Sequence, residues 1–141
     1  MKHNGCVADI HYSYNVSYKF TEIEELKLTF LFEESKHVDE IKSYSIDMTL
    51  DETSIFYSGD SCNLKKTIQD WINSKHSVAF DLAYIDTCKA DYDGNVHLSL
   101  RKLTELIEPE HRRKVWCMHL DEGFIREEAE ALGFNVVVNE F

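Results

Sequence analysis

Apolar and polar residues alternate along much of the first half of the chain, a pattern typical of half-buried strands. The alternation runs over residues 10–18, over Leu26 to Phe32 and over Tyr44 to Met48. A short turn over residues 50–53 leads into Ser54–Tyr57, so the last two stretches of strand are expected to form a hairpin. Residues 1–25 do not resemble a usual domain start, and we treat them as a segment of uncertain role before a domain at residues 26–141.

The second half of the chain alternates between short apolar runs and helical periodicity. Buried strands are predicted at Val78–Thr87, Val115–Met118 and Phe134–Val138. Helices are predicted between them, with their apolar faces at Leu64, Ile68, Trp71 and Ile72, then at Leu100, Leu103, Leu106 and Ile107, and finally around Ile125, Ala129 and Leu132. Asn63 is the expected N-cap of the first helix, and Gly133 is the expected left-handed C-cap of the last. A meander followed by alternating strands and helices predicts an α/β fold with a mixed β-sheet.

Length and composition place the chain among soluble domains. Its 141 residues suit one domain, and a hydrophobic content of 43% is too high for disorder. No apolar run approaches the roughly 20 residues of a membrane span, and no signal-peptide pattern opens the sequence. Without CxxC spacing, the cysteines are interpreted as reduced thiols of a cytoplasmic protein: Cys6, Cys62, Cys88 and Cys117. We also expect Trp71 and Trp116 in the core.

The charge balance restricts the possible ligands. With 15 basic and 26 acidic residues, the chain has a net charge of −11, which would repel a phosphate backbone. We therefore expect no general nucleic-acid binding, and an anionic substrate would need a local cation such as a metal ion. The basic run His111–Lys114 could meet a substrate phosphate, although a solvated turn is the simpler interpretation.

Polar residues with metal-binding chemistry follow three of the predicted strands. His37 comes after the strand ending near Phe32, Asp60 follows Ile55–Ser58, and His119 follows Val115–Met118. Ligands of α/β proteins bind at the carboxyl edge of the sheet, where such residues would meet. Two imidazoles and a carboxylate suit zinc or manganese.

These motifs also carry a resemblance to a known family. Ile55–Ser61, with Gly59-Asp60-Ser61, resembles the strand-plus-Gly-Asp-Thr/Ser motif of metallo-β-lactamase-fold hydrolases. His37 is similar to the ligand histidine that precedes this hairpin, and His119 is similar to the final ligand histidine after a late strand. His97 resembles the proton-donating histidine of the ribonuclease Z and phosphodiesterase branch. The resemblance covers roughly residues 26–141 and implies the C-terminal half of an αββα sandwich.

The resemblance implies specific roles for these residues. Two divalent metals, zinc or manganese, would be bridged by Asp60, with His37 and His119 as further ligands. Asp60 and His97 would be catalytic, with His97 as a general acid kept off the metals. Asp86 would orient a ligand histidine or, equally, cap a turn. The implied reaction is hydrolysis of a phosphodiester or a related small ester.

The family's main signature, His-x-His-x-Asp-His in its N-terminal half, does not occur in this sequence. We therefore expect the chain to pair with an N-terminal half or to self-associate, and whether it is an enzyme by itself stays open. Two other interpretations remain: a catalytically inactive half-domain that serves as a binding module, and a regulatory α/β domain in which the histidines are coincidental.

Overall fold

The computed structural model describes residues 18–23, 27–35, 37–38, 41–74 and 79–138, without the side chains of residues 18–23. Its strands are β1 (Tyr18–Ile23), β2 (Leu28–Ser35), β3 (Ser43–Leu50), β4 (Thr53–Tyr57), β5 (Leu82–Asp86), β6 (Val115–Met118) and β7 (Asn135–Val136). Its helices are α1 (Lys66–Ile72), α2 (Leu100–Leu106) and α3 (Arg126–Ala131), with a 3₁₀ helix η2 (Pro109–Lys114) before β6. Each strand after β4 follows a helical segment or leads into one.

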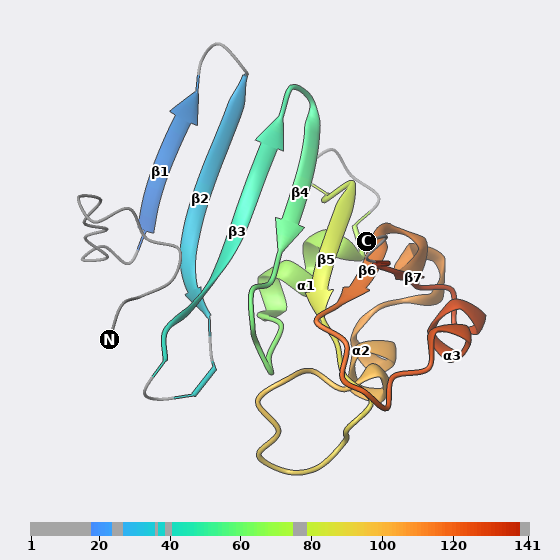
Figure 1. The fold of residues 1–141 in the computed structure, drawn as a ribbon. Helices are drawn as coiled ribbons and strands as arrows, with labels where there is room; N and C mark the ends of the chain where they lie inside the picture. The colour runs from blue at the N-terminus through green and yellow to red at the C-terminus, as the bar shows by residue number, and fades with distance from the viewer. Residues whose placement is uncertain (1–17, 24–26, 36, 39–40, 75–78, 139–141) are drawn as a thin grey trace.

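A single mixed sheet organises the chain (Figure 1). Its seven strands lie in sequence order, antiparallel from β1 to β4 and parallel from β4 to β7. This confirms the predicted α/β class with a mixed sheet. Because β2 and β4 both run antiparallel to β3, they run in the same direction, and β5 and β6 run parallel to β4. The carboxyl ends of β2, β4, β5 and β6 therefore meet at one edge.

One face of the sheet carries the hydrophobic core. Phe56, Ala83, Ile85, Val115 and Cys117 alternate along β4, β5 and β6 and are buried. The helices supply the opposite side of this core with Ile68, Ile72, Leu100, Leu103 and Ala129, and Leu64 joins it from the segment before α1. None of the helices in the described ranges is long and apolar enough to cross a membrane.

The opposite face of the sheet is also apolar but has no covering layer among the described residues. Directly paired residues of neighbouring strands point to the same face. The strand register therefore aligns one row of Phe30, Met48, Ile55 and Leu82 and a second row of Phe32, Ile46, Tyr57, Tyr84 and Trp116. Every one of these side chains is half-buried or exposed, whereas the core side chains of β4, β5 and β6 are buried. We call this surface the open face.

Several details differ from the sequence predictions. The N-cap of α1 is Lys65 without a side-chain cap, because Asn63 instead joins a turn with Ser61. Trp71 is 40% exposed, and Trp116 lies on the open face, stacked on Tyr84 at a ring distance of 6.2 Å. Both tryptophans were wrongly expected in the core, since periodicity does not reveal whether a face is covered. Gly133 has the expected positive φ of 95°. The alternation predicted over residues 10–17 lies outside the described residues.

A carboxylate interrupts the apolar side that the helices cover. Asp47 of β3 pairs with Leu31 on one side and Phe56 on the other, so it shares their face. Burial raises the pKa of Asp47 to about 6, and the nearby Glu33 charge adds to this effect, while Lys65 opposes it. An acid whose folded pKa is raised stabilises the protein less once it ionises, so stability should fall as pH rises from about 4 to about 6.

We predict that Asp47→Asn raises the free energy of unfolding at pH 7 by about 1 kcal/mol, a value reduced for solvent screening of this half-buried group. The substitution should also flatten the pH dependence between pH 4 and pH 6. Urea unfolding at several pH values measures both effects. Equal slopes for the two proteins across this range would contradict the assignment.

Candidate metal centre

Four strands deliver polar side chains to the same edge of the sheet. His37 follows β2, Asp60 follows β4, Asp86 ends β5 and His119 follows β6. Because these strands run in one direction, the residues after their carboxyl ends gather although they are far apart in sequence. The long loop between β5 and α2 adds His97 to this group (Figure 1).

Hydrogen bonds between the ends of β4 and β5 fix this edge. Ser58 donates its backbone N–H to Tyr84 O at 2.9 Å, and its hydroxyl oxygen accepts the backbone N–H of Asp86 at 2.8 Å. The backbone N–H of Ser61 donates to Asp86 Oδ2, also at 2.8 Å. Ser58, Ser61 and Asp86 are all buried. The loop that carries Asp60 is thus tied to the buried carboxylate of the neighbouring strand.

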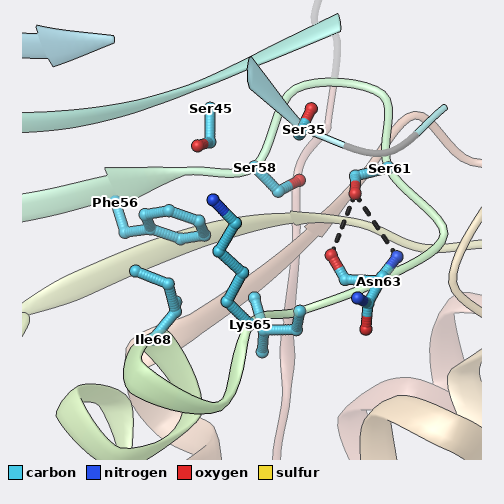
Figure 2. A pocket seen from close by; sticks show the side chains of 9 residues that line it. Ser35, Ser45, Phe56, Ser58, Ser61, Asn63, Lys65 and Ile68 are labelled. Carbon is cyan, nitrogen blue, oxygen red and sulfur yellow. Dashed lines mark hydrogen bonds between the residues drawn. The ribbon is translucent and has the colours of Figure 1, made fainter. Parts of the chain in front are cut away.

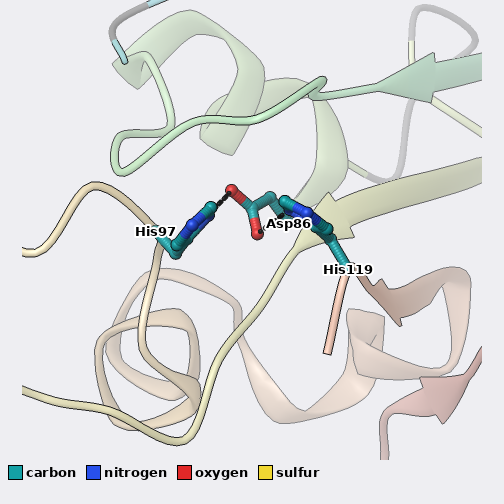
Figure 3. A group of neighbouring side chains, drawn as sticks. All are labelled: Asp86, His97 and His119. Atoms are coloured by element: carbon teal, nitrogen blue, oxygen red, sulfur yellow. Dashed lines mark hydrogen bonds and ion pairs between the residues drawn. The ribbon is translucent and has the colours of Figure 1, made fainter. Parts of the chain in front are cut away.

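Asp86 lies between two histidines (Figure 3). His97 Nδ1 lies 2.7 Å from Asp86 Oδ2, and His119 Nδ1 lies 3.4 Å from Asp86 Oδ1. The rings of His97 and His119 meet edge to face with centroids 4.9 Å apart. Beside an ionised Asp86, which can only accept hydrogen bonds, His97 would donate from Nδ1 and keep Nε2 as its second functional nitrogen.

The predicted ligands border the same cluster. His119 Nδ1 lies 3.1 Å from Asp60 Oδ1, and the His37 ring lies 5.7 Å from the His97 ring. The structure thus brings His37, Asp60, His97 and His119 together, with Asp86 at their centre. Neighbouring ligands of a tetrahedral zinc ion lie about 3.3 Å apart, given metal–ligand bonds near 2 Å. The separation of Asp60 and His119 fits that spacing.

Unsatisfied buried atoms provide a second test of the fit. Asp86 Oδ1 and His37 Nδ1 are buried without a hydrogen-bond partner. Leaving a buried polar atom without a hydrogen bond costs about 1–3 kcal/mol, which a cation bound to Asp86 Oδ1 would offset. Asp86, His97 and His119 also offer ligand atoms within 4.8 Å of one another. A divalent metal therefore fits Asp86, His97 and His119, and of the predicted ligands His37, Asp60 and His119 only His119 belongs to this group.

The backbone at His119 is in an uncommon conformation. His119 has a φ of 56°, in the left-handed region that residues with a side chain seldom adopt. Such conformations typically cost 1–3 kcal/mol and persist where the surrounding structure imposes them, often at functional sites. Two residues on, the Asp121 carboxylate accepts the backbone N–H groups of Lys89 at 2.8 Å and Ala90 at 3.2 Å. This contact joins the loop after β6 to the loop that carries His97.

A second group with possible ligand atoms consists of Glu108, Glu110 and His111. It lies at the start of β6, at the opposite end from His119, and its two glutamates are exposed. The adjacent Arg112 donates to the carbonyls of Thr104, Ile107 and Leu132 and lies over the Phe134 ring. The guanidinium is therefore engaged in holding α2 and α3, and we assign no ligand to this region.

A small pocket lies behind the loop that carries Asp60, on the helix side of the sheet (Figure 2). Its polar lining is mostly hydroxyl groups, from Ser35, Ser45, Ser58 and Ser61. The Lys65 ammonium that crosses it is paired with Glu33. With its cation already neutralised, the pocket is suited to water, and we assign no ligand to it.

Comparison with known proteins agrees with this architecture. The family model of the anti-Pycsar protein Apyc1 matches residues 7–140. The chain belongs to the Apyc1 family. No curated protein matched the sequence. The solved structure of the metallo-beta-lactamase fold protein YhfI from Bacillus subtilis is similar, with a TM-score of 0.62 and 15% sequence identity.

The match to YhfI covers 87% of this chain but 50% of the YhfI chain. This Apyc1-family chain therefore spans about half the length of that structure, and its sheet and helices match half of a metallo-beta-lactamase fold. At this identity the likeness shows the fold alone. The expected resemblance is confirmed at the level of the fold, and the assignment of individual ligands stays a prediction.

Asp86 is the residue whose importance the sequence understated. It was expected to orient a ligand histidine or to cap a turn, with equal weight. The structure instead places it against His97, against His119 and beneath the backbone of Ser61. The available signal was the carboxylate at the end of a strongly apolar strand, since a charge at such a position needs partners.

We predict that Gly59→Ala destabilises the chain by about 2 kcal/mol or more, since Gly59 has a φ of 61° and an added Cβ would lie 2.3 Å from Tyr44 O. Gly94→Ala is the matched control, because Gly94 also has a positive φ, 86°, but its added Cβ would meet nothing within 4 Å. Urea unfolding of both variants makes the comparison. Equal losses of stability would show that the approach of Tyr44 does not constrain the loop.

Proposed function

We propose that this chain supplies half of a metal-dependent phosphodiesterase that hydrolyses cyclic nucleotides. Apyc1 proteins degrade cyclic nucleotides, and the chain belongs to this family. The observation that carries the proposal is the buried Asp86 carboxylate, which faces His97 on one side and His119 on the other. An imidazole beside candidate metal ligands supports this proposal, because phosphodiester hydrolysis uses a proton donor and a metal-activated water.

In this proposal His37, Asp60 and His119 would hold the divalent ions, zinc or manganese. Imidazole nitrogens and carboxylate oxygens are suitable donors for both metals. When bound, the metals would supply positive charge for the phosphoryl oxygens and lower the pKa of water. The histidines must be neutral to bind, so metal affinity should fall in acid. A concentrated local charge would also let an anionic substrate approach a chain of net charge −11.

His97 is the general acid in this proposal, while Asp86 orients it. Asp86 holds Nδ1, so Nε2 of the protonated ring can face the substrate. Water adds its oxygen to phosphorus and loses a proton to solvent, the bond from phosphorus to one ribose oxygen breaks, and that oxygen takes the proton from His97. Solvent then returns a proton to His97. Nothing in this step changes oxidation state, and the product is the ring-opened nucleotide monophosphate. Removing such a proton donor typically slows turnover by 10²–10⁴-fold.

We predict that His97→Ala lowers turnover of the complete site about 100-fold or more with metal content unchanged, whereas Asp60→Asn lowers metal content itself. The assay measures cyclic-nucleotide hydrolysis by the chain mixed with an N-terminal half of an Apyc1 relative carrying His-x-His-x-Asp-His. Asp93→Asn, which changes an exposed carboxylate on the His97 loop, is the control.

Elemental analysis of the same samples separates the two roles. Loss of metal from His97→Ala would make His97 a ligand and contradict its assignment as the acid. A metal-loaded complex that hydrolyses no cyclic nucleotide would overturn the proposed activity and favour a binding module.

We also propose that the open face docks the N-terminal half of a metallo-β-lactamase fold. The two apolar rows cross β2 to β6 without a covering layer among the described residues, and a soluble monomer seldom exposes an apolar patch above a few hundred Å². YhfI, which has this fold, contains about twice the matched length. The same docking would bring the missing ligands of the signature to the site. Self-association is the alternative occupant of this face.

We predict that light scattering of the isolated chain gives a mass above the monomer value of 16.5 kDa, and that adding an N-terminal half replaces this with a one-to-one complex. Phe32→Lys should weaken both associations because it places a charge within the second apolar row. Ile41→Lys is the control, since Ile41 is 62% exposed and lies outside both rows. A stable monomer that does not bind an N-terminal half would contradict the docking proposal.

A further inference from the structure

The loop that carries His97 is closed at its two ends but irregular between them. An isolated parallel bridge joins Cys88 to Ser99. The backbone N–H of Cys88 donates to Leu98 O, and the backbone carbonyl of Cys88 accepts the N–H of Leu100, both at 2.9 Å. Between these anchors the loop forms turns and bends without a strand or helix (Figure 1). Side chains must therefore hold the position of His97, since fixing the backbone of each irregular residue costs about 1–2 kcal/mol of entropy.

Asn95 is the residue inside this loop with contacts on both sides. Its amide Nδ2 donates to Ala90 O at 2.7 Å and to Cys88 Sγ at 3.2 Å. Its carbonyl Oδ1 accepts the backbone N–H of His97 at 3.1 Å. The side chain is 8% exposed. An amide is suited to this position because it donates to a carbonyl at one end and accepts from an N–H at the other.

The contacts of Asn95 connect His97 to the rest of the site. Ala90 and Lys89 are held by Asp121, in the loop after His119. Cys88 also donates its thiol to Ala90 O at 3.2 Å, and burial raises the pKa of that thiol, which keeps it protonated. The chain of contacts thus runs from Asp121 through Ala90 and Asn95 to the backbone of His97, whose ring then reaches Asp86.

We propose that Asn95 is a positioning residue for His97: it holds the loop so that the imidazole keeps its contact with Asp86. This inference rests on the proposed function for its catalytic consequence, but the positioning itself can be tested without activity. Without the amide, the backbone N–H of His97 loses its hydrogen bond to the Asn95 side chain. The loop then becomes more mobile, and the His97 ring no longer keeps its contact with Asp86. Partners of this indirect kind typically contribute ten- to a hundredfold to activity.

The direct test is nitrogen NMR of the full chain with labelled histidine. In the unaltered chain, His97 should show the tautomer protonated at Nδ1, because that nitrogen faces the Asp86 carboxylate. In Asn95→Ala, the His97 signal should shift to the mixture of tautomers of a solvated histidine. The complemented enzyme should lose turnover about ten- to a hundredfold while its metal content stays constant.

Asn73→Ala is the matched control. Asn73 also bridges two backbone segments, donating to Leu106 O and accepting from the Glu108 N–H, both at 2.9 Å, but away from the site. It should lower stability and leave the His97 tautomer unchanged. If Asn95→Ala does not fold, the same spectra are taken on Asn95→Leu, which keeps a similar size but loses both the amide donors and the acceptor of the His97 N–H.

An unchanged Nδ1 tautomer in the folded Asn95 variant would overturn the proposal. The other failure has two parts: the tautomer of His97 shifts in the Asn95 variant, but the complex with Asn95 present hydrolyses no cyclic nucleotide. This result would support the positioning role of Asn95 and refute the proposed function. The two failures are therefore distinguishable.

Discussion

The parallel contact between β4 and β5 is the constraint on which the site depends. If the antiparallel meander of β1 to β4 continued, the next strand would run in the direction opposite to β4. The crossover through α1 instead makes β5 run in the same direction as β4. The carboxyl ends of four strands then meet at one edge. Ser58 and Ser61 join the ends of β4 and β5 by hydrogen bonds to Asp86: the Ser58 hydroxyl accepts its backbone N–H, and the Ser61 N–H donates to its carboxylate. That carboxylate is buried, and its Oδ2 lies at hydrogen-bond distance, 2.7 Å, from His97 Nδ1.

The second constraint is that, within the part of the chain that the structure describes, the helices cover one face of the sheet and leave the other without a covering layer. The core between β4–β6 and the helices buries apolar side chains fully, whereas the rows on the open face remain partly exposed. A second layer packed against the uncovered face would bury its exposed apolar side chains. In the proposed complex, the same docking would both bury this face and complete the set of ligands. Folding of the interface and assembly of the site would then be one event, so that activity depends on association.

Much of the fold could be predicted because its strands and helices carry distinct periodicities. The alternation along Phe30 and Phe32, and again along Ile46 and Met48, identified β2 and β3 and the mixed sheet. The apolar run before Asp86 identified β5, although the strand begins at Leu82 rather than at Val78. Local chemistry was less decisive at the start of α1, where Asn63 bonds within its own turn instead of capping the helix. The exposure of Trp116 could not be predicted, because it depends on whether a layer from a distant part of the sequence covers its face of the sheet.

The candidate site was predictable in its residues but not in its centre. The positions of His37, Asp60 and His119 after strands could be anticipated, since the topology brings strand ends to one edge. The central place of Asp86 arises from hydrogen bonds to Ser58 and Ser61, which are 28 and 25 residues away. Contacts of that range depend on register, and a register is a property of the folded sheet rather than of any local pattern.

The central claim is that Asp60 and His119 bind metal at this edge while Asp86 orients His97. Anomalous diffraction from crystals grown with zinc, using the chain bound to its N-terminal half, tests that claim most directly. The account predicts anomalous peaks within about 2.2 Å of Asp60 and His119 donor atoms, with His97 Nδ1 still on Asp86. Metal bound instead between Asp86 and His97, with Asp60 uncoordinated, would contradict it.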